Sequence, residues 1–129
     1  MLSIIVPSYN RKAEVPALLE SLTQQTSTHF EVIIVDDCSK EKVIVEQSYS
    51  FPVTVIRNET NQGAAESRNI GARASKGDWL LFLDDDDRFM PEKCEKVLQV
   101  IEQNPNINFI YHPAKLSLIH ISEPTRPEP

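Results

Sequence analysis

Four consecutive aspartates, Asp84 to Asp87, directly follow an apolar run, Leu80 to Leu83, and precede a proline, Pro91. Adjacent carboxylates repel by roughly 1 to 4 kcal/mol per pair, between a water-like and a surface-like dielectric, so the cluster is unfavourable unless something compensates it. A bound divalent cation would supply that compensation. A solvated acidic turn that caps a helix opening at Pro91 is the alternative, and this stretch alone does not separate the two.

Two more acids follow the apolar run that begins at Phe30, in the sequence VDDCS. Asp and Ser after a strand commonly bond their own backbone, and this is the interpretation that we favour for the motif taken alone. A second interpretation has one carboxylate accept the imide N–H of a base such as uracil, because a buried base edge needs a matching acceptor. Cys38, among these acids, lacks the electropositive surroundings of a reactive thiolate.

Tyr9 and Arg68 are two further candidates. Tyr9 follows the first apolar run, where its ring could stack on a base or pack at the edge of the fold. The Arg68 guanidinium could pair with a diphosphate in forked geometry. Arg73, five residues later, is interpreted as an ordinary solvated arginine.

The elements that would position these residues alternate between β-rich runs and helix-like segments, which is typical of a parallel sheet covered on both faces. We predict strands at residues 2–7, 30–37, 53–58, 78–87 and 107–112, and helices at 12–26, 40–50, 64–75 and 91–105. The helix at 40–50 is the weakest of these, because its Val-Ile-Val run is strand-like.

Three helices carry patterns that predict how they pack. Leu18, Leu19 and Leu22 share one face of the first helix, and Val97, Leu98 and Ile101 share one face of the last, so both faces are predicted to join the core. Small residues in the helix at 64–75 recur at helical spacing, which predicts a close approach to the sheet. These small residues are Ser67, Gly71 and Ala74.

In an open doubly wound sheet, ligands bind beyond the carboxyl ends of the strands, where the strand order reverses. The candidate residues follow such ends: Pro7 to Asn10, Asp36 and Asp37, Arg57 and Asn58 with Asn61 and Gly63 close behind, and Asp84 to Asp87. With the strand order 3-2-1-4, these ends line one rim. The four aspartates then face Tyr9 and Asp37 across a crevice.

The composition suits one domain of 129 residues with a single core. The net charge of -6 argues against binding a nucleic acid backbone, which needs a basic surface. Cys38 and Cys94 lie far apart without metal-ligand spacing, so we expect free thiols in a reducing compartment, the cytoplasm. The longest apolar runs are too short to span a bilayer, and no targeting signal is visible.

The last residues differ from the rest of the chain. The stretch after Lys115 has three prolines in its final six residues and no clear periodicity. We therefore expect one domain at residues 1–115 and an irregular, non-native tail at residues 116–129.

Three segments together resemble the family two inverting glycosyltransferases, which have the nucleotide-sugar-binding GT-A fold. They are SIIVPSYN, VIIVDDCS and NQGAAESRNIGARASKGDWLLFLDDDDRFMPEK, in the order and at approximately the spacing of that family. The resemblance runs from Ser3 to about Tyr111 and implies the amino-terminal, donor-binding half of such an enzyme. Together the motifs are specific, whereas VPSYN or a pair of aspartates alone is weak.

The resemblance also implies roles for individual residues. Pro7 and Tyr9 would border the nucleoside, Asp37 would contact the base, and Arg68 would lie near the donor pocket. The Asp-x-Asp signature of the family maps onto Asp84, Asp85 and Asp86, with Asp84 and Asp86 facing the ribose and the metal-diphosphate, Asp85 between them in the donor site, and Asp87 a neighbouring or capping acid. Carboxylates suit Mg²⁺ or Mn²⁺, which are hard ions that bind oxygen and bridge protein to phosphate.

The implied reaction is displacement at the anomeric carbon of the sugar of a nucleoside-diphosphate sugar, with inversion, by a hydroxyl of a saccharide or lipid-linked acceptor. The metal would offset charge on the leaving diphosphate, and a carboxylate base would take the acceptor proton. In the family that base comes from a later segment, so this chain is expected to bind donor weakly and to transfer no sugar alone. Cys38 stands where the family usually has glycine, and we expect a different backbone angle there.

Other classes of protein remain open at this point. A nucleotidyltransferase would use a metal and a nucleotide, but it is expected to carry a Gly-rich basic loop after the first strand, and PSYNRKAEVP has no glycine. A phosphoacceptor receiver domain predicts a lone aspartate after the third strand, where VTVIRNE has none. A noncatalytic, metal-free nucleotide-binding or interaction module would show no Mn²⁺-dependent thermal shift.

Overall fold

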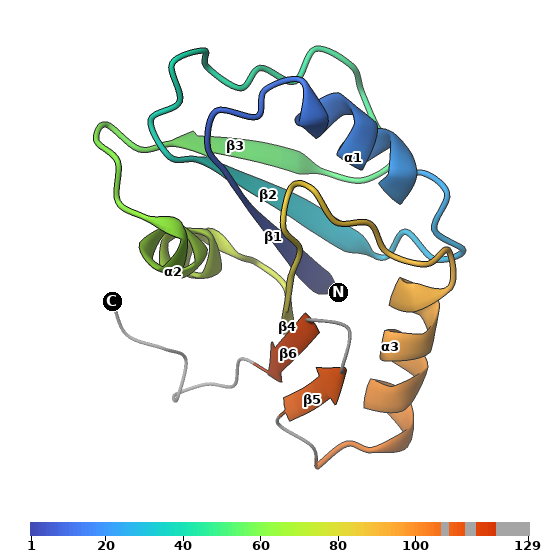
Figure 1. Cartoon of the computed structure of the whole chain (residues 1–129). Helices are drawn as coiled ribbons and strands as arrows, with labels where there is room; N and C mark the ends of the chain where they lie inside the picture. Colours follow the sequence, from blue (N-terminus) through green and yellow to red (C-terminus); the bar gives the residue numbers. More distant parts are fainter. Residues whose placement is uncertain (107–108, 113–115, 121–129) are drawn as a thin grey trace.

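The computed structural model describes residues 1–106, 109–112 and 116–120, with side chains for residues 1–106. Four parallel strands in the order β3-β2-β1-β4 form the parallel part of an open sheet, with β3 at one edge (Figure 1). They are β1 (Leu2–Ser8), β2 (Phe30–Asp36), β3 (Val53–Arg57) and β4 (Trp79–Phe82). The two middle strands are almost wholly buried, as strands covered on both faces must be. The predicted fold, an open, mostly parallel sheet with this order, is confirmed.

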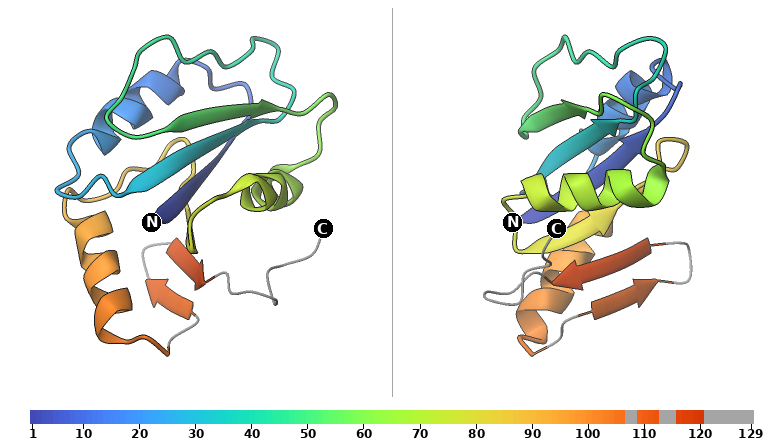
Figure 2. Two further views of the ribbon diagram at one scale, coloured as in Figure 1. Left: turned by 180° about the vertical axis from the view of Figure 1, so that it is seen from behind. Right: turned by 90° about the vertical axis from the view of Figure 1, so that its left-hand side faces the viewer.

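Three helices cover the two faces of the sheet (Figure 2). They are α1 (Glu14–Leu22), α2 (Ala64–Ala74) and α3 (Lys93–Gln103). α1 and α3 pack on one face, and α2 packs on the other. None of the helices within the described residues is long and apolar enough to cross a membrane.

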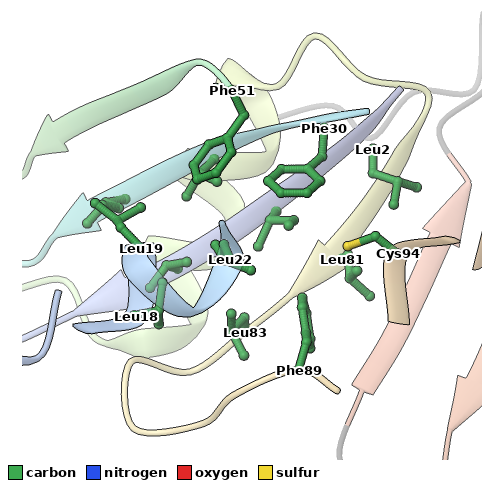
Figure 3. Close-up of a cluster of buried hydrophobic side chains, with 14 of the residues drawn as sticks. Leu2, Leu18, Leu19, Leu22, Phe30, Phe51, Leu81, Leu83, Phe89 and Cys94 are labelled. Carbon is green, nitrogen blue, oxygen red and sulfur yellow. The ribbon is translucent and has the colours of Figure 1, made fainter. Parts of the chain in front are cut away.

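The larger part of the core lies between the sheet and the pair α1 and α3 (Figure 3). Leu18, Leu19 and Leu22 are at most 1% exposed, as their shared face predicts. On α3, Val97 is buried, and Leu98 and Ile101 pack partly buried against the same cluster. Both predicted stripes are thus core, and full burial of each such side chain contributes about 1.5 to 3 kcal/mol.

The other face is thinner, because α2 lies directly on the sheet. A Cβ atom at Gly71 would come within 2.5 Å of Ile5 Cγ2, so only glycine permits this approach. Ser67 is fully buried, as predicted, but Ala74 is exposed. The prediction for Ala74 is therefore wrong: the buried face continues to Ser75, which is four residues after Gly71 and thus on the same side of the helix.

The predicted helix at residues 40–50 is also wrong, since these described residues form no helix. Val43 and Val45 turn toward the core while Ile44 is 53% exposed, which is the alternation of an extended chain. The Val43 N–H donates to the Asp36 carboxylate at 3.0 Å rather than to a helical carbonyl. Phe51 then packs on Phe30, with ring centroids 4.8 Å apart, and returns the chain to β3.

Two further strands, β5 (Phe109–His112) and β6 (Leu116–His120), extend the sheet beyond β4. β6 pairs antiparallel with β4, so that Leu80 lies opposite Ile119, and β5 pairs antiparallel with β6. The expectation of irregular chain after residue 115 is therefore wrong for Leu116–His120, whose backbone satisfies the open edge of β4. Residues 107–108 of the predicted last strand and residues 121–129 of the predicted tail lie outside the described residues.

Candidate functional site

A cavity of about 570 Å³ lies where β1, β2 and β4 end. It is lined by Pro7, Ser8, Tyr9, Arg11, Asp37, Asn61, Gly63, Ala64, Ser67, Arg68, Asp84, Asp85 and Asp86. All seven residues that we assigned to the donor and the metal therefore line one cavity, and Asp37 and Asp86 lie on the same side of the molecule. A second hollow, of about 780 Å³ beside the start of α1, shares Arg11 but contains none of the seven.

The four aspartates form a tight turn after β4. The Asp87 N–H donates to the Asp84 carbonyl at 3.0 Å. This turn gathers one carboxylate oxygen each from Asp84, Asp86 and Asp87 within 4.8 Å of one another. Such a set of oxygens suits a hard divalent cation. The turn thus places Asp87 among the candidate metal ligands, whereas the sequence analysis gave Asp87 a neighbouring or capping role.

The capping alternative can be tested on α3. That helix begins at Lys93 with Glu92 as its N-cap; the Glu92 side chain makes no cap hydrogen bond, and the Cys94 N–H of the first turn donates to Gln25 Oε1 at 3.0 Å. The aspartates end five residues or more before the helix and so do not satisfy its free N–H groups. Helix capping therefore does not compensate the repulsion among the carboxylates of Asp84 to Asp87.

Asp85 points away from the other three acids, toward the end of β1. It is 8% exposed, and its Oδ1 lies 3.6 Å from Arg11 Nε. Burial raises the pKa of Asp85; Arg11 and the Ser8 hydroxyl lower it, and the charges of Asp86 and Asp84 raise it again, so that the pKa ends above its ordinary value. The turn thus presents one carboxylate to the interior and leaves the others around an open space.

The Arg68 guanidinium, on α2, reaches across to the acid turn. Its Nη2 lies 3.1 Å from Asp84 Oδ1, and both side chains are partly exposed, so the guanidinium remains accessible from the cavity. Arg73 pairs instead with Glu66 of the same helix at 3.0 Å and does not line the cavity. The two arginines therefore differ in their surroundings, and the arginine that we interpreted as solvated forms an ion pair within its own helix.

The two acids that follow β2 are nearly enclosed. Asp37 is 5% exposed; its Oδ1 accepts from Asn58 Nδ2 at 2.9 Å and from the Gln62 N–H at 2.7 Å, and its Oδ2 accepts from the Gly63 N–H at 2.9 Å. Burial raises the pKa of Asp37, but these hydrogen bonds outweigh it and the pKa ends lower than usual. These donors lie 21 to 26 residues further along the chain, so the interpretation that the carboxylate bonds its own backbone does not describe Asp37.

Asp36 is fully buried and serves the fold. Its Oδ1 accepts from the Ser39 N–H at 3.1 Å, and its Oδ2 accepts from the Val43 N–H at 3.0 Å and from Arg57 Nη1 at 2.8 Å. Burial raises its pKa, and the hydrogen bonds from Ser39, Val43 and Arg57 together bring it below the ordinary value.

With this geometry in place, comparison with known proteins decides the family. The sequence model described as Glycosyl transferase family 2 matches residues 3–117. The chain belongs to this family. The resemblance read from the three motifs is confirmed.

Relatives of this family 2 chain are longer than the chain itself. An uncharacterized glycosyltransferase of Haemophilus influenzae is 83% identical over 133 aligned positions, which cover 99% of this chain and 45% of the relative. The Escherichia coli enzyme named UDP-Glc:alpha-D-GlcNAc-diphosphoundecaprenol beta-1,3-glucosyltransferase WfgD is 33% identical, over 86% of this chain and 44% of its own length. The chain thus spans less than half the length of these curated relatives.

Solved structures show the same fold. Staphylococcus aureus TarS 1-349 superposes with a TM-score of 0.69 at 30% identity, over 81% of this chain and 33% of TarS, and related TarS structures hold UDP or UDP-GlcNAc. The mannosyltransferase PcManGT of Pyrobaculum calidifontis, solved with GDP-Man and Mn²⁺, has a TM-score of 0.73 at 14% identity, over 92% of this chain and 44% of PcManGT. At that identity the likeness shows the fold alone. The predicted GT-A fold is confirmed.

Sequence reasoning missed several residues that line the cavity of this family 2 chain. Arg11 is one of them, and its position just after the end of β1 is a signal that could have found it; Ser8 was placed at the rim but given no role. Ser8 Oγ is buried and makes no hydrogen bond of regular geometry within the described residues. Asn61 and Gly63 were placed near the rim but given no role; Gly63 has a φ of 91°, which favours glycine.

Cys38 departs from the expectation for its backbone. We expected a different angle where the family usually has glycine, yet Cys38 has a φ of 61°, in the left-handed region that glycine favours. The turn therefore keeps the glycine-type conformation despite the side chain. Both cysteines are free thiols, and burial raises the pKa of Cys94 to about 12.

Proposed function

We propose that residues 1–115 of this family 2 chain are the donor-binding part of a glycosyltransferase that holds a nucleoside-diphosphate sugar through a divalent cation, Mg²⁺ or Mn²⁺. The observation that carries the proposal is the single cavity lined by Tyr9 and Asp37 together with the turn Asp84 to Asp86. One space with an exposed aromatic ring, a buried acceptor and an acid cluster suits a ligand that has a base and a charged diphosphate.

The residues present fit a hard cation. Asp84 and Asp86, with Asp87, offer oxygen ligands within 4.8 Å of one another, the donor type that Mg²⁺ and Mn²⁺ prefer. When bound there, the ion would offset the charge that develops on the leaving nucleoside diphosphate.

Other residues that line the cavity would contact the base and the diphosphate of the donor. Tyr9, 51% exposed, presents a ring on which a base can stack, and Pro7 borders the same space. Arg68 is positioned to pair with a diphosphate, since within residues 1–106 its guanidinium pairs with the partly exposed Asp84. Asp85 belongs to the donor site through the cavity that it lines.

The names of similar proteins support a uridine nucleotide as the donor carrier. TarS, 30% identical, has been solved with UDP and with UDP-GlcNAc, and the Escherichia coli relative is named for UDP-Glc and a diphosphoundecaprenol acceptor. We propose that the parent enzyme transfers its sugar, with inversion, to a hydroxyl of a saccharide or lipid-linked acceptor. We assign no general base among the described residues, and propose that the base and the acceptor contacts belong to the rest of the parent protein.

The compartment follows from the thiols. Cys38 and Cys94 are both free, which fits a reducing environment, and we propose that the protein works in the cytoplasm. Alkylation of both cysteines in denatured protein taken directly from cells would support this, and a cysteine found oxidised would contradict it.

The test is calorimetric titration of the 129-residue chain with UDP, with and without Mn²⁺. We expect binding that Mn²⁺ strengthens at least about tenfold and that Asp86→Ala weakens by a similar factor. Asp78→Ala is the matched control, because the Asp78 side chain is 78% exposed and, within residues 1–106, makes one ion pair, with the amino terminus at 3.9 Å. Heat that is unaffected by the metal or by Asp86→Ala would contradict the proposal and favour a metal-free binding module.

A further inference from the structure

The carboxylate of Asp37 is occupied mainly by the loop that leads into α2. Two of its three donors are the backbone N–H groups of Gln62, at 2.7 Å, and of Gly63, at 2.9 Å. Gly63 is the N-cap position of α2, and no side-chain cap bond forms there from the local sequence. Asp37, from the end of β2, thus binds the N–H of the N-cap residue, one of the free N–H groups at this end of the helix, together with the N–H just before it, and places a negative charge at the helix N-terminus.

A second connection reaches the first turn of the helix. Asn58 Nδ2 donates to Asp37 Oδ1 at 2.9 Å and to Ser67 Oγ at 3.3 Å, and Ser67 is fully buried. The Ser67 N–H donates to the Gly63 carbonyl at 3.0 Å, within that first turn. Asp37 and Asn58 together therefore tie the start of α2 to the end of β2 at two points.

Arg68 is the residue after Ser67 and depends on this connection. Its guanidinium lies 3.1 Å from Asp84 Oδ1, and the base of its side chain moves with the first turns of α2, so its place beside the acid turn depends on where the helix lies. Gly71 already rests against Ile5, which prevents the helix from moving closer to the sheet. The remaining freedom, sliding or turning of its first turn, is what the hydrogen bonds of Asp37 oppose.

We propose that Asp37 is a positioning residue for Arg68: it caps α2 from β2 and so holds the guanidinium beside the acid turn, where the diphosphate of the donor would bind. This inference rests on the proposed function. It leaves room for a base contact, because the three hydrogen bonds use two acceptor positions of Oδ1 and one of Oδ2. Asp37 then links the nucleoside end of the site to its phosphate end.

The two roles of Asp37 can be separated with a ligand that has no base. Asp37→Asn places an amide among backbone donors, and we expect it to weaken inorganic pyrophosphate binding in Mn²⁺ on the order of tenfold, the size of effect seen for groups that orient ligand-binding residues. A residue that contacts only the base would weaken UDP binding and leave pyrophosphate unchanged. That outcome would overturn the inference.

A second variant keeps the test decisive if Asp37→Asn does not fold. Asn58→Ala removes one hydrogen bond to Asp37 and the link to Ser67 while keeping the carboxylate, and we expect a several-fold loss of pyrophosphate affinity in the same direction. Arg73→Ala is the matched control on the same helix, because Arg73 lies outside the cavity. Equal pyrophosphate affinity in Asn58→Ala and in the unmodified chain would count against the inference.

A measurement without ligand separates this inference from the proposed function. Amide hydrogen exchange at Gln62 and Gly63 is expected to be at least about tenfold faster in Asp37→Asn, beyond any change in global stability. Retained protection there would overturn the capping role whatever the chain binds. Failure of the unmodified chain to bind UDP with Mn²⁺ would instead overturn the proposed function, and with it the link to the diphosphate.

Discussion

The two groups of acids in this chain are built in opposite ways. Asp36 and Asp37 are buried, and both carboxylates accept hydrogen bonds from backbone N–H groups and from side chains of β3 or the loop after it. Asp84, Asp86 and Asp87 gather their oxygens at a partly or fully exposed turn, where Arg68 is the paired cation of Asp84. Both groups follow strands of the same sheet and reach the same rim.

The difference separates charge that serves the fold from charge that is available to a ligand. A carboxylate with several internal donors stabilises the chain and has little capacity left for a ligand. Carboxylates that face one another raise the energy of the free protein, and a bound cation lowers it again. Asp37 stands between the two cases, since it is enclosed and still lines the cavity.

The largest expected effect comes from Asp36→Asn. This change weakens acceptance from Val43 and Ser39 and leaves Arg57 without its counter-charge, so we expect a loss of about 3 kcal/mol in the free energy of unfolding. Urea denaturation at pH 7 measures it. Asp86→Asn is the same chemical change in the other group and serves as the control; an equal loss in both variants would remove the distinction between them.

The second expected effect is a loss of stability at low pH, which comes from the enclosed pair Asp36 and Asp37. The hydrogen bonds of Asp36 and Asp37 bring each pKa below the ordinary 3.8 of the unfolded chain. A lowered pKa stabilises the fold above the unfolded value, and this stabilisation is lost as the pH falls from there through the folded value. The expected slope is about 1.4 kcal/mol per pH unit for each carboxylate. Denaturation between pH 5 and pH 3 should show it, and the slope should be shallower in Asp36→Asn.

A smaller effect of opposite sign is expected from Asp86→Asn without metal. Removing one of the facing charges should raise the free energy of unfolding by about 0.5 kcal/mol, because exposed like charges repel only weakly in water. The gain should shrink in high salt, which screens exposed charges. Thermal unfolding at low and high salt measures both effects, and a loss of stability would show that Asp86 has a structural role like that of Asp36.

The smallest expected effect is at Cys38, which follows the enclosed pair. Its φ of 61° is costly for any side chain, so Cys38→Gly should relieve strain, offset in part by the greater freedom of glycine in the unfolded chain. A net gain of a few tenths of a kcal/mol is expected, measured by urea denaturation. A clear loss would mean that the contact from Cys38 Sγ to the Glu59 carbonyl, at 3.4 Å, outweighs the strain.

Most of the sheet could be predicted because its strands are continuous apolar runs that end in polar residues. The order 3-2-1-4 then brought Tyr9, Asp37 and Asp84 to one rim without any knowledge of contacts. Residues 40–50 could not be predicted in the same way. Their structure depends on the hydrogen bond from Val43 to Asp36 and on the packing of Phe51 on Phe30, and no local pattern encodes either contact.

The sequence predicted which residues line the cavity, but it did not predict how their side chains are oriented. Residue type and position found the acids, yet only the coordinates show that Asp85 turns inward toward Arg11 while Asp87 joins Asp84 and Asp86. The enclosure of Asp37 by Gln62 and Gly63 had no sequence signal either, because both donors are backbone groups. The sequence thus indicates which side chains reach the rim. It does not indicate the orientation of each side chain there.

The contact at Gly71 has a consequence for how a donor could be accommodated. Since α2 touches the sheet where even a methyl group would collide with Ile5, the helix cannot move closer to the sheet at this wall of the cavity. The opposite wall is a short turn of mutually repelling carboxylates at the surface. If the chain binds a donor as proposed, we expect adjustment to sugars of different size at the aspartate turn rather than by an inward movement of α2.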